Sequence, residues 1–111
     1  MSDPLIHPDI QAHVAATPLA DTHEHQHSEQ DWVENGPADV LCDLLATYVT
    51  TDFHGAHCDI PALDRAQKNP EIGVRERWDG LKDEWEHIRD TGYAEAMALH
   101  ARDVYGIDEI T

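Results

Sequence analysis

Apolar residues recur at the spacing of one helix face in three stretches of the chain. The clearest stretch steps by four, three, four and three positions and predicts a long helix over residues 74–90, with the apolar residues Val74, Trp78, Leu81, Trp85 and Ile88. A second stretch predicts a helix over residues 38–50, with the apolar residues Val40, Leu41, Leu44, Leu45, Tyr48 and Val49. A third predicts a helix that starts near Tyr93 and ends before Gly106, a residue typical of helix C-caps.

Two shorter helices are indicated by residues that favour helix ends. Pro8 suits a first helical turn and Thr17 precedes a second proline, which predicts a helix over residues 8–17. Asp59 is a predicted N-cap of a helix that runs to about Lys68. Residues 28–37 are polar and end in a Gly-Pro pair, so we expect them to be irregular.

The segment between the predicted helix at residues 8–17 and the irregular residues 28–37 has a different pattern. Residues 19–25 begin with alternating apolar and polar positions and then place histidine at every second position, which predicts one short strand that runs into a loop. The fold class expected for the isolated chain is therefore mainly α with one short strand. Such a strand needs a partner for its backbone N–H and C=O groups, and the sequence predicts no second strand.

The length fits one small domain. The chain has 111 residues, far below the about 250 residues of an eight-stranded β/α barrel, so residues 1–111 are treated as a single segment. No apolar run approaches the roughly 20 residues of a membrane span. Residues 1–4 carry no basic side chain, which predicts no signal peptide and a cytoplasmic protein. Cys42 and Cys58 are then expected to be free thiols.

The charge balance limits the possible partners. The chain has 23 acidic and 7 basic residues and a formal net charge of −16. A field of this sign repels phosphate backbones and anionic lipid, so neither nucleic acid nor a membrane surface is an expected partner. Lys68 and Lys82 are its only lysines. An acidic, lysine-poor surface suggests a halophilic host, because concentrated salt screens the self-repulsion of such a surface.

Histidine spacing is the strongest chemical signal in the sequence. On a strand, His23 and His25 point to the same face, where two imidazoles can bind one divalent ion, which we expect to be zinc. Asp21 shares that face and is a candidate to orient an imidazole or to accept a proton. His27 would continue the face if the strand extended that far, and is a candidate for the second shell or for substrate contact.

Other candidate sites have plainer explanations. His54 and His57 could contact a substrate, or could join Cys42 and Cys58 in a mixed zinc cluster, but the spacing matches no standard zinc finger. A polar loop with one buried cysteine explains these residues better. We expect the tryptophans of the 74–90 helix to pack in a core or an interface. Surface ion pairs at helical spacing are expected for the arginines in this region, Arg75, Arg77 and Arg89.

The run from Leu19 to His25 resembles the first-strand motif of the amidohydrolase superfamily, metal-dependent hydrolases built on a TIM barrel. In that family the histidines that match His23 and His25 are metal ligands. The stretch from residue 38 to residue 111 resembles, more loosely, the helical insertion of the branch that contains uronate isomerases and amidohydrolase-related proteins. The residues that carry this looser similarity are Trp78, Trp85, Thr91-Gly92-Tyr93 and Arg102 to Ile107.

The resemblance implies the N-terminal portion of an enzyme in which metal-activated water attacks a small polar substrate. Isomerisation and decarboxylation also occur among relatives of this fold. The family's complete site has further histidines and an aspartate from later strands, which this chain does not supply, so we expect the 111 residues alone to be inactive. The alternative is a stand-alone acidic helical module that acts through its Trp78–Trp85 face, with an incidental histidine cluster. A partner or self-association would then cover the apolar face and the unpaired strand, whereas in the incomplete enzyme a missing C-terminal part would do so.

Overall fold

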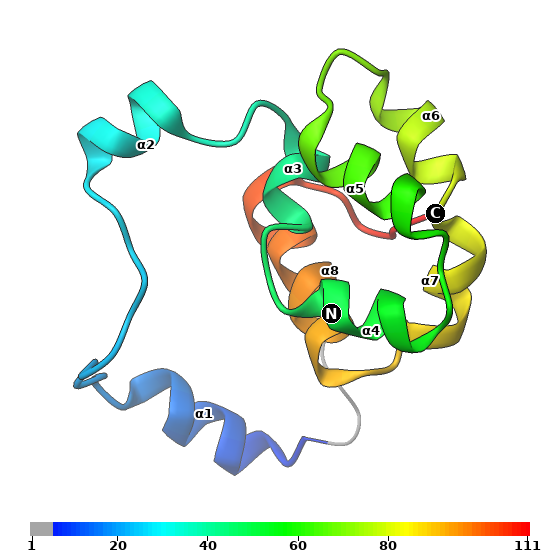
Figure 1. Cartoon of the computed structure of the whole chain (residues 1–111). Coiled ribbons are helices and arrows are strands. Elements are labelled where there is room, and N and C mark those ends of the chain that lie inside the picture. The colour runs from blue at the N-terminus through cyan, green and yellow to red at the C-terminus, as the bar shows by residue number, and fades with distance from the viewer. Residues whose placement is uncertain (1–5) are drawn as a thin grey trace.

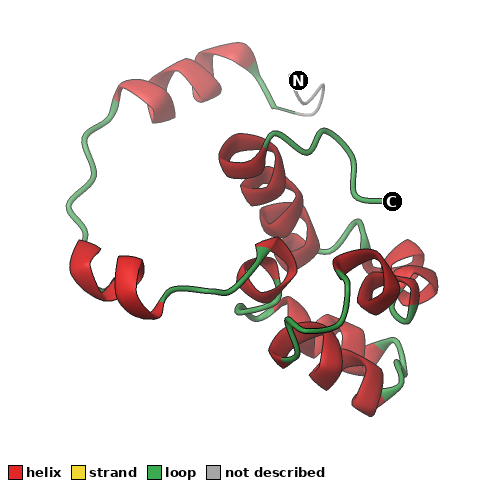
Figure 2. Ribbon diagram, turned by 90° about the horizontal axis from the view of Figure 1, so that it is seen from above, coloured by secondary structure: helices red, strands yellow, loops and turns green. Residues whose placement is uncertain are grey.

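A computed structural model describes residues 6–111 and contains eight helices in that range (Figure 1). They are α1 (Pro8–Ala16), α2 (Glu29–Asn35), α3 (Val40–Leu44), α4 (Val49–Gly55), α5 (Ile60–Lys68), α6 (Val74–Asp79), α7 (Lys82–Ile88) and α8 (Gly92–Tyr105). No strand occurs between residues 6 and 111 (Figure 2). The mainly α prediction is therefore confirmed at this level.

The helices divide the molecule into an arm, residues 6–38, and a body, residues 39–111. Figures 1 and 2 show α1, α2 and their extended connection forming an open arc beside the packed helices α3 to α8. The radius of gyration is 15.8 Å, whereas a compact chain of this length has about 13 Å. The arm accounts for this expansion, because it extends away from the body.

The body has a single hydrophobic core. Its fully buried side chains include Phe53 and Leu45, and every buried residue lies between Leu41 and Ala101. The ring centroid of Phe53 lies 6.3 Å from that of Trp78 and 6.4 Å from that of Trp85, and the two indoles are 5.9 Å apart. Trp78 and Trp85 are thus central core residues, and the proposed interaction module cannot act through them as an exposed face.

Several helix ends form where the sequence predicts them. The Asp59 carboxylate accepts a hydrogen bond from the Ala62 N–H at 3.2 Å and caps α5 as expected. α8 ends at Gly106, which adopts a left-handed conformation with φ 69°. The Thr91 hydroxyl caps the start of α8 by accepting the Ala94 N–H at 3.1 Å.

Two predicted long helices are each divided in two. The 74–90 helix breaks at Gly80 and Leu81, where the Leu81 N–H bonds the Trp78 carbonyl at 2.8 Å in a tight turn. A Cβ on Gly80 would lie 3.4 Å from the Cβ of Ala62, which is an ordinary contact, so α5 packs closely against this turn. The break retains the apolar spacing and still buries Leu81 completely.

The 38–50 helix is replaced by α3 and α4. It starts late because Asp39 is the N-cap of α3, accepting the Cys42 N–H at 3.0 Å. It is interrupted after Leu44, in a region where threonine hydroxyls bond nearby backbone groups. The Thr50 hydroxyl donates to the Thr47 carbonyl at 3.2 Å, and such local bonds compete with continuous helix.

The arm differs from the prediction at two places. Residues 28–37, expected to be irregular, contain α2, whose N-cap Ser28 accepts the Asp31 N–H at 3.1 Å. The predicted strand over residues 19–25 is wrong, and the first barrel strand implied by the resemblance is not formed. Every residue from 6 to 30 is exposed, and no strand in the described chain pairs with this segment.

Arg77 corrects the expectation of surface ion pairs. Arg75 and Arg89 do pair with Asp79 and Glu86 at helical spacing. The Arg77 side chain is only 1% exposed and pairs with Asp39, 38 positions away. Its guanidinium also donates to the carbonyls of Ile72 and Ala66, at 2.8 Å each.

Two further expectations concern the cysteines and membrane insertion. Cys42 and Cys58 are both free thiols, as expected. Over residues 6–111, no helix has the length and apolar character required to cross a bilayer. The residues used for the signal-peptide prediction, 1–4, lie outside the described part of the chain.

Candidate metal centre

The two histidines of the motif converge in the structure even though they lie on no strand. The Nε2 atoms of His23 and His25 are 3.0 Å apart, and the ring centroids are 4.9 Å apart with the planes at 66°. This is the distance of a hydrogen bond between the two ring nitrogens. It is also a distance at which both nitrogens can bind one ion. The sequence predicted this convergence on a strand, and the rings meet here on a backbone that forms no strand.

The two rings are held by an extended backbone with local hydrogen bonds. The Asp21 carboxylate accepts the His23 main-chain N–H at 3.1 Å. The Glu24 carboxylate likewise accepts the main-chain N–H of Gln26. Asp21 therefore contacts the backbone of His23 rather than its ring, and it can orient the imidazole only indirectly.

A hollow of about 460 Å³ adjoins this pair on the side of α2. It is lined by His25, Gln26, His27, Glu29 and Trp32. Trp32 is 54% exposed, and His27 is turned toward α2, with Nδ1 3.4 Å from the Asp31 carboxylate. His27 thus lies beside the candidate centre without extending the His23–His25 pair. Sequence reasoning missed Trp32 because α2 was not predicted, although Ser28 and Asp31 have the spacing of a helix-capping motif.

The remaining predicted site residues lie on the body. His54 belongs to α4 and is exposed, and His57 follows that helix in a left-handed conformation with φ 60°. Cys58 is buried in the core, where desolvation raises the pKa of its thiol. Within residues 6–111, no three histidine, cysteine or acidic side chains are grouped so that they could hold a metal ion. The mixed zinc cluster of Cys42, His54, His57 and Cys58 is therefore not assembled in this structure.

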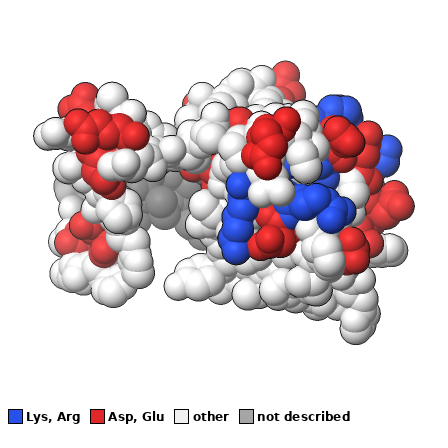
Figure 3. Space-filling view, turned by 45° about the horizontal axis from the view of Figure 1, so that its top comes forward, with Lys and Arg blue, Asp and Glu red and all other residues white. Residues whose placement is uncertain are grey.

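The surroundings of the histidine pair carry negative charge. Arg65 is the first basic residue of the sequence, so the arm has no lysine or arginine. In Figure 3 acidic groups cover the arm, and the visible lysines and arginines gather on the body. A cation is attracted by this field, and an anion is repelled.

A second polar cluster, which sequence reasoning missed, joins α3 to α8. The buried Asp43 carboxylate accepts the Tyr105 hydroxyl at 2.5 Å and lies 3.1 Å from His100 Nε2. Desolvation and this acceptor raise the pKa of Tyr105 to about 12. The phenol thus stays protonated and holds the end of α8 against α3. No local sequence signal links residues 43 and 105.

Comparisons with protein-family models, with curated proteins and with solved structures give no match for this chain.

Proposed function

We propose that this chain is the N-terminal portion of a metal-dependent amidohydrolase-like enzyme, in which His23 and His25 bind a divalent ion such as zinc. The observation that supports the proposal most directly is the 3.0 Å separation of their Nε2 atoms. The resemblance of residues 19–25 to the family motif supplies the reaction class. The substrate would be a small polar molecule.

The donor geometry fits a six-coordinate divalent ion better than a tetrahedral one. Two nitrogens 3.0 Å apart, each about 2.0–2.1 Å from a shared ion, subtend an angle of about 94° at that ion. This is close to the about 90° of neighbouring ligands in octahedral coordination and smaller than a tetrahedral angle. Neutral imidazole is a favoured ligand of zinc and of several other divalent transition metals.

The chain's own residues would supply part of the site. His23 and His25 hold the ion, and Asp21 fixes the backbone that carries the first ring. A bound divalent ion would supply a hydroxide-like water as nucleophile. The other ligands and the proton acceptor would come from polypeptide outside residues 6–111. We therefore expect the isolated chain to bind metal without turnover.

The exposed arm is consistent with such completion. Leu19, just before the motif, is 95% exposed, and Val14 is 67% exposed. In the proposed enzyme, neighbouring strands would cover these side chains and pair with the backbone of residues 19–25. The polypeptide that forms these strands would also provide the missing metal ligands.

The test is a zinc titration of the full 111-residue chain, measured by calorimetry. The buffer contains 0.5 M KCl, which suppresses weak zinc binding to acidic side chains. We expect one zinc per chain, and a loss of at least about tenfold in affinity when His23 and His25 are both replaced by alanine. His13→Ala, an exposed histidine on α1, is the matched control and should leave the affinity unchanged. Equal affinity in the double variant would reject the metal site.

The alternative function, an acidic interaction module, is favoured by one observation. The core is built entirely from residues of the body, which is the behaviour of a self-contained unit. Its contact surface would be the apolar side of the arm, with Ile10, Val14 and Trp32, instead of the buried tryptophans. Light scattering, a thermal melt and the zinc titration together distinguish the two proposals. A monodisperse monomer that melts cooperatively and binds no zinc supports the module.

A further inference from the structure

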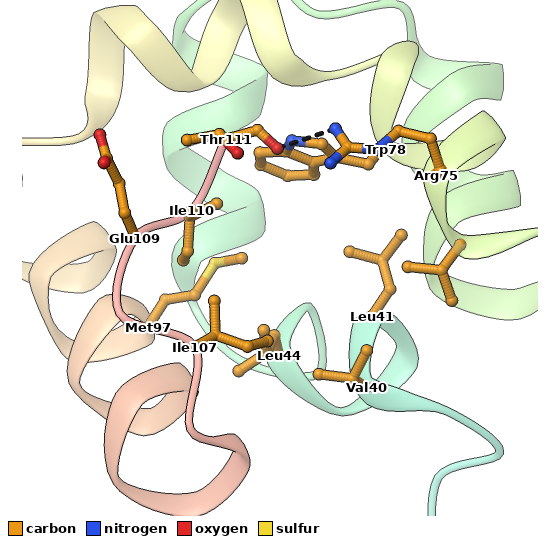
Figure 4. A pocket seen from close by; sticks show the side chains of 11 residues that line it. Val40, Leu41, Leu44, Arg75, Trp78, Met97, Ile107, Glu109, Ile110 and Thr111 are labelled. Atoms are coloured by element: carbon orange, nitrogen blue, oxygen red, sulfur yellow. Dashed lines mark hydrogen bonds between the residues drawn. The ribbon is translucent and has the colours of Figure 1, made fainter.

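A cavity on the body lies far along the chain from the histidine pair. Its volume is about 310 Å³, the lower end of the range of small-molecule sites. Its lining comes from α3, α6, α8 and the C-terminal tail that crosses one side (Figure 4). The apolar part of that lining consists of Val40, Leu41, Leu44, Val74, Trp78, Met97, Ile107 and Ile110.

Trp78 contributes a hydrogen-bond donor to the lining of this cavity. The residue is only 5% exposed, and its indole Nε1 is buried without a hydrogen-bond partner among the described residues. It is the one buried side-chain nitrogen or oxygen in residues 6–111 that lacks a partner. A buried N–H group without an acceptor costs about 1–3 kcal/mol. Nε1 itself is covered, so an acceptor in the cavity reaches it only when a neighbouring lining side chain shifts, and the bond would then remove that cost.

Arg75 places positive charge at the same end of the cavity. Its Nη1 donates to the main-chain oxygen of Thr111 at 2.9 Å and lies 3.8 Å from the Asp79 carboxylate. The remaining guanidinium N–H groups can serve a second acceptor, because arginine carries five donors. Figure 4 shows Arg75, Thr111 and Trp78 together above the apolar walls, with the carboxylate of Glu109 extending away from them.

We propose that this cavity binds a small monocarboxylate with an apolar body. One carboxylate oxygen accepts the Trp78 indole N–H, the other pairs with Arg75, and the hydrocarbon part contacts Leu41, Leu44 and Met97. A charged acceptor suits Arg75, and a straight chain of about eight carbons suits the cavity's size. This site is independent of the proposed metal centre, since none of its lining residues belongs to the arm.

The test uses octanoate as the probe, with 1-octanol as a neutral match for its chain. Nuclear magnetic resonance reports binding through the indole N–H signals of the three tryptophans. Saturable octanoate binding should move the Trp78 signal downfield more than that of Trp85, and octanol should bind about tenfold more weakly. Equal binding of the two probes, or no saturable binding at millimolar octanoate, would overturn the proposal.

Two pairs of variants separate the donors from general packing. Trp78→Phe keeps an aromatic ring but removes the N–H, and should weaken octanoate binding about fivefold to tenfold, whereas Trp85→Phe should not. Arg75→Gln should weaken octanoate by about tenfold and leave octanol unchanged, with Arg89→Gln as the control. Circular dichroism first confirms that each variant is folded. If Trp78→Phe binds octanoate like the wild type, a water satisfies the indole and the proposed site is wrong. None of these outcomes depends on zinc.

Discussion

The arm and the body differ in how far they bury their apolar side chains. The body packs Phe53, Leu81 and their neighbours to complete burial. The arm leaves Ile10 62% exposed and Val33 76% exposed, and contains no buried residue between 6 and 38. Both regions contain capped helices, so local signals form helices equally well in each. The difference lies in tertiary contacts, which only the body has.

This contrast separates the residues that stabilise the fold from those that carry candidate chemistry. Most helix stability in proteins comes from packing of an apolar face, and the arm's helices lack it. The same lack leaves the nitrogens of His23 and His25 accessible to a metal ion. The contrast predicts that substitutions in the arm affect metal binding with little change in stability, and that substitutions in the core of the body affect stability.

The largest expected effect is on the aromatic core. Phe53→Ala should lower the free energy of unfolding by about 3–5 kcal/mol, because it leaves a cavity between two indoles. Trp32→Ala, an even larger truncation in the arm, should change it by less than about 0.5 kcal/mol. Urea unfolding followed by circular dichroism measures both. Similar losses in the two variants would mean that the arm packs on the body in solution.

The buried ion pair of Asp39 and Arg77 should give the next effect. Burial raises the pKa of Asp39, but the Cys42 N–H and the Arg77 guanidinium outweigh it, so the pKa is below the ordinary 3.8. The resulting stability is complete above pH 3.8 and is lost as the pH falls through the lowered value. Asp39→Asn should cost about 1.5–3 kcal/mol at pH 7. The difference from the wild type should shrink as the pH is lowered below 3.8 in urea unfolding, and a difference independent of pH would contradict the ion-pair assignment.

A smaller effect is expected at Tyr105. Its pKa is raised to about 12 from the ordinary 10, so the stability from its protonated hydroxyl is complete below pH 10 and is lost as the pH rises toward 12. Tyr105→Phe should cost about 1 kcal/mol at pH 7 and should remove one late-titrating tyrosinate from the ultraviolet spectrum. If the variant shows the same late step as the wild type, the hydrogen bond to Asp43 is not the cause.

The smallest expected effect is the dependence of the melting temperature on salt concentration. The excess of acidic residues should make the melting temperature rise by a few degrees between about 0.2 and 3 M KCl, because screening shortens the range of repulsion to about 3 Å at 1 M. Thermal melts across a KCl series measure this change. A flat or falling melting temperature would reject the halophilic interpretation.

The sequence predicts the body's helices better than the arm. Apolar spacing located many of the core residues, although Tyr48 and Val74 on the same predicted faces are exposed. Asp59 and Gly106 marked helix ends correctly. The breaks after Leu44 and at Gly80 were missed because an apolar stripe continues in register across a tight turn. The pairing of Arg77 with Asp39 depends on how α3 and α6 pack, which local spacing does not encode.

The metal centre at His23 and His25 stays a prediction, and the backbone predicted for it is wrong. Alternation at His23 and His25 indicated convergent side chains, and their rings do converge. The strand itself does not form, because the described chain offers no partner for its backbone hydrogen bonds. The cavity beside Trp78 had no sequence signal, since it results from the way the C-terminal tail crosses the core.

The most direct test of the proposed division of roles is a titration with paramagnetic Co²⁺ at 0.5 M KCl, read from the indole N–H signals of the three tryptophans. Trp32 lines the same hollow as His25, whereas Trp78 and Trp85 are buried in the body. We predict that the Trp32 signal broadens first and that the signals of the two core tryptophans persist. Replacing both His23 and His25 by alanine should abolish the selective broadening. Equal broadening of all three signals, or unchanged broadening in the double variant, would contradict a metal site on the arm.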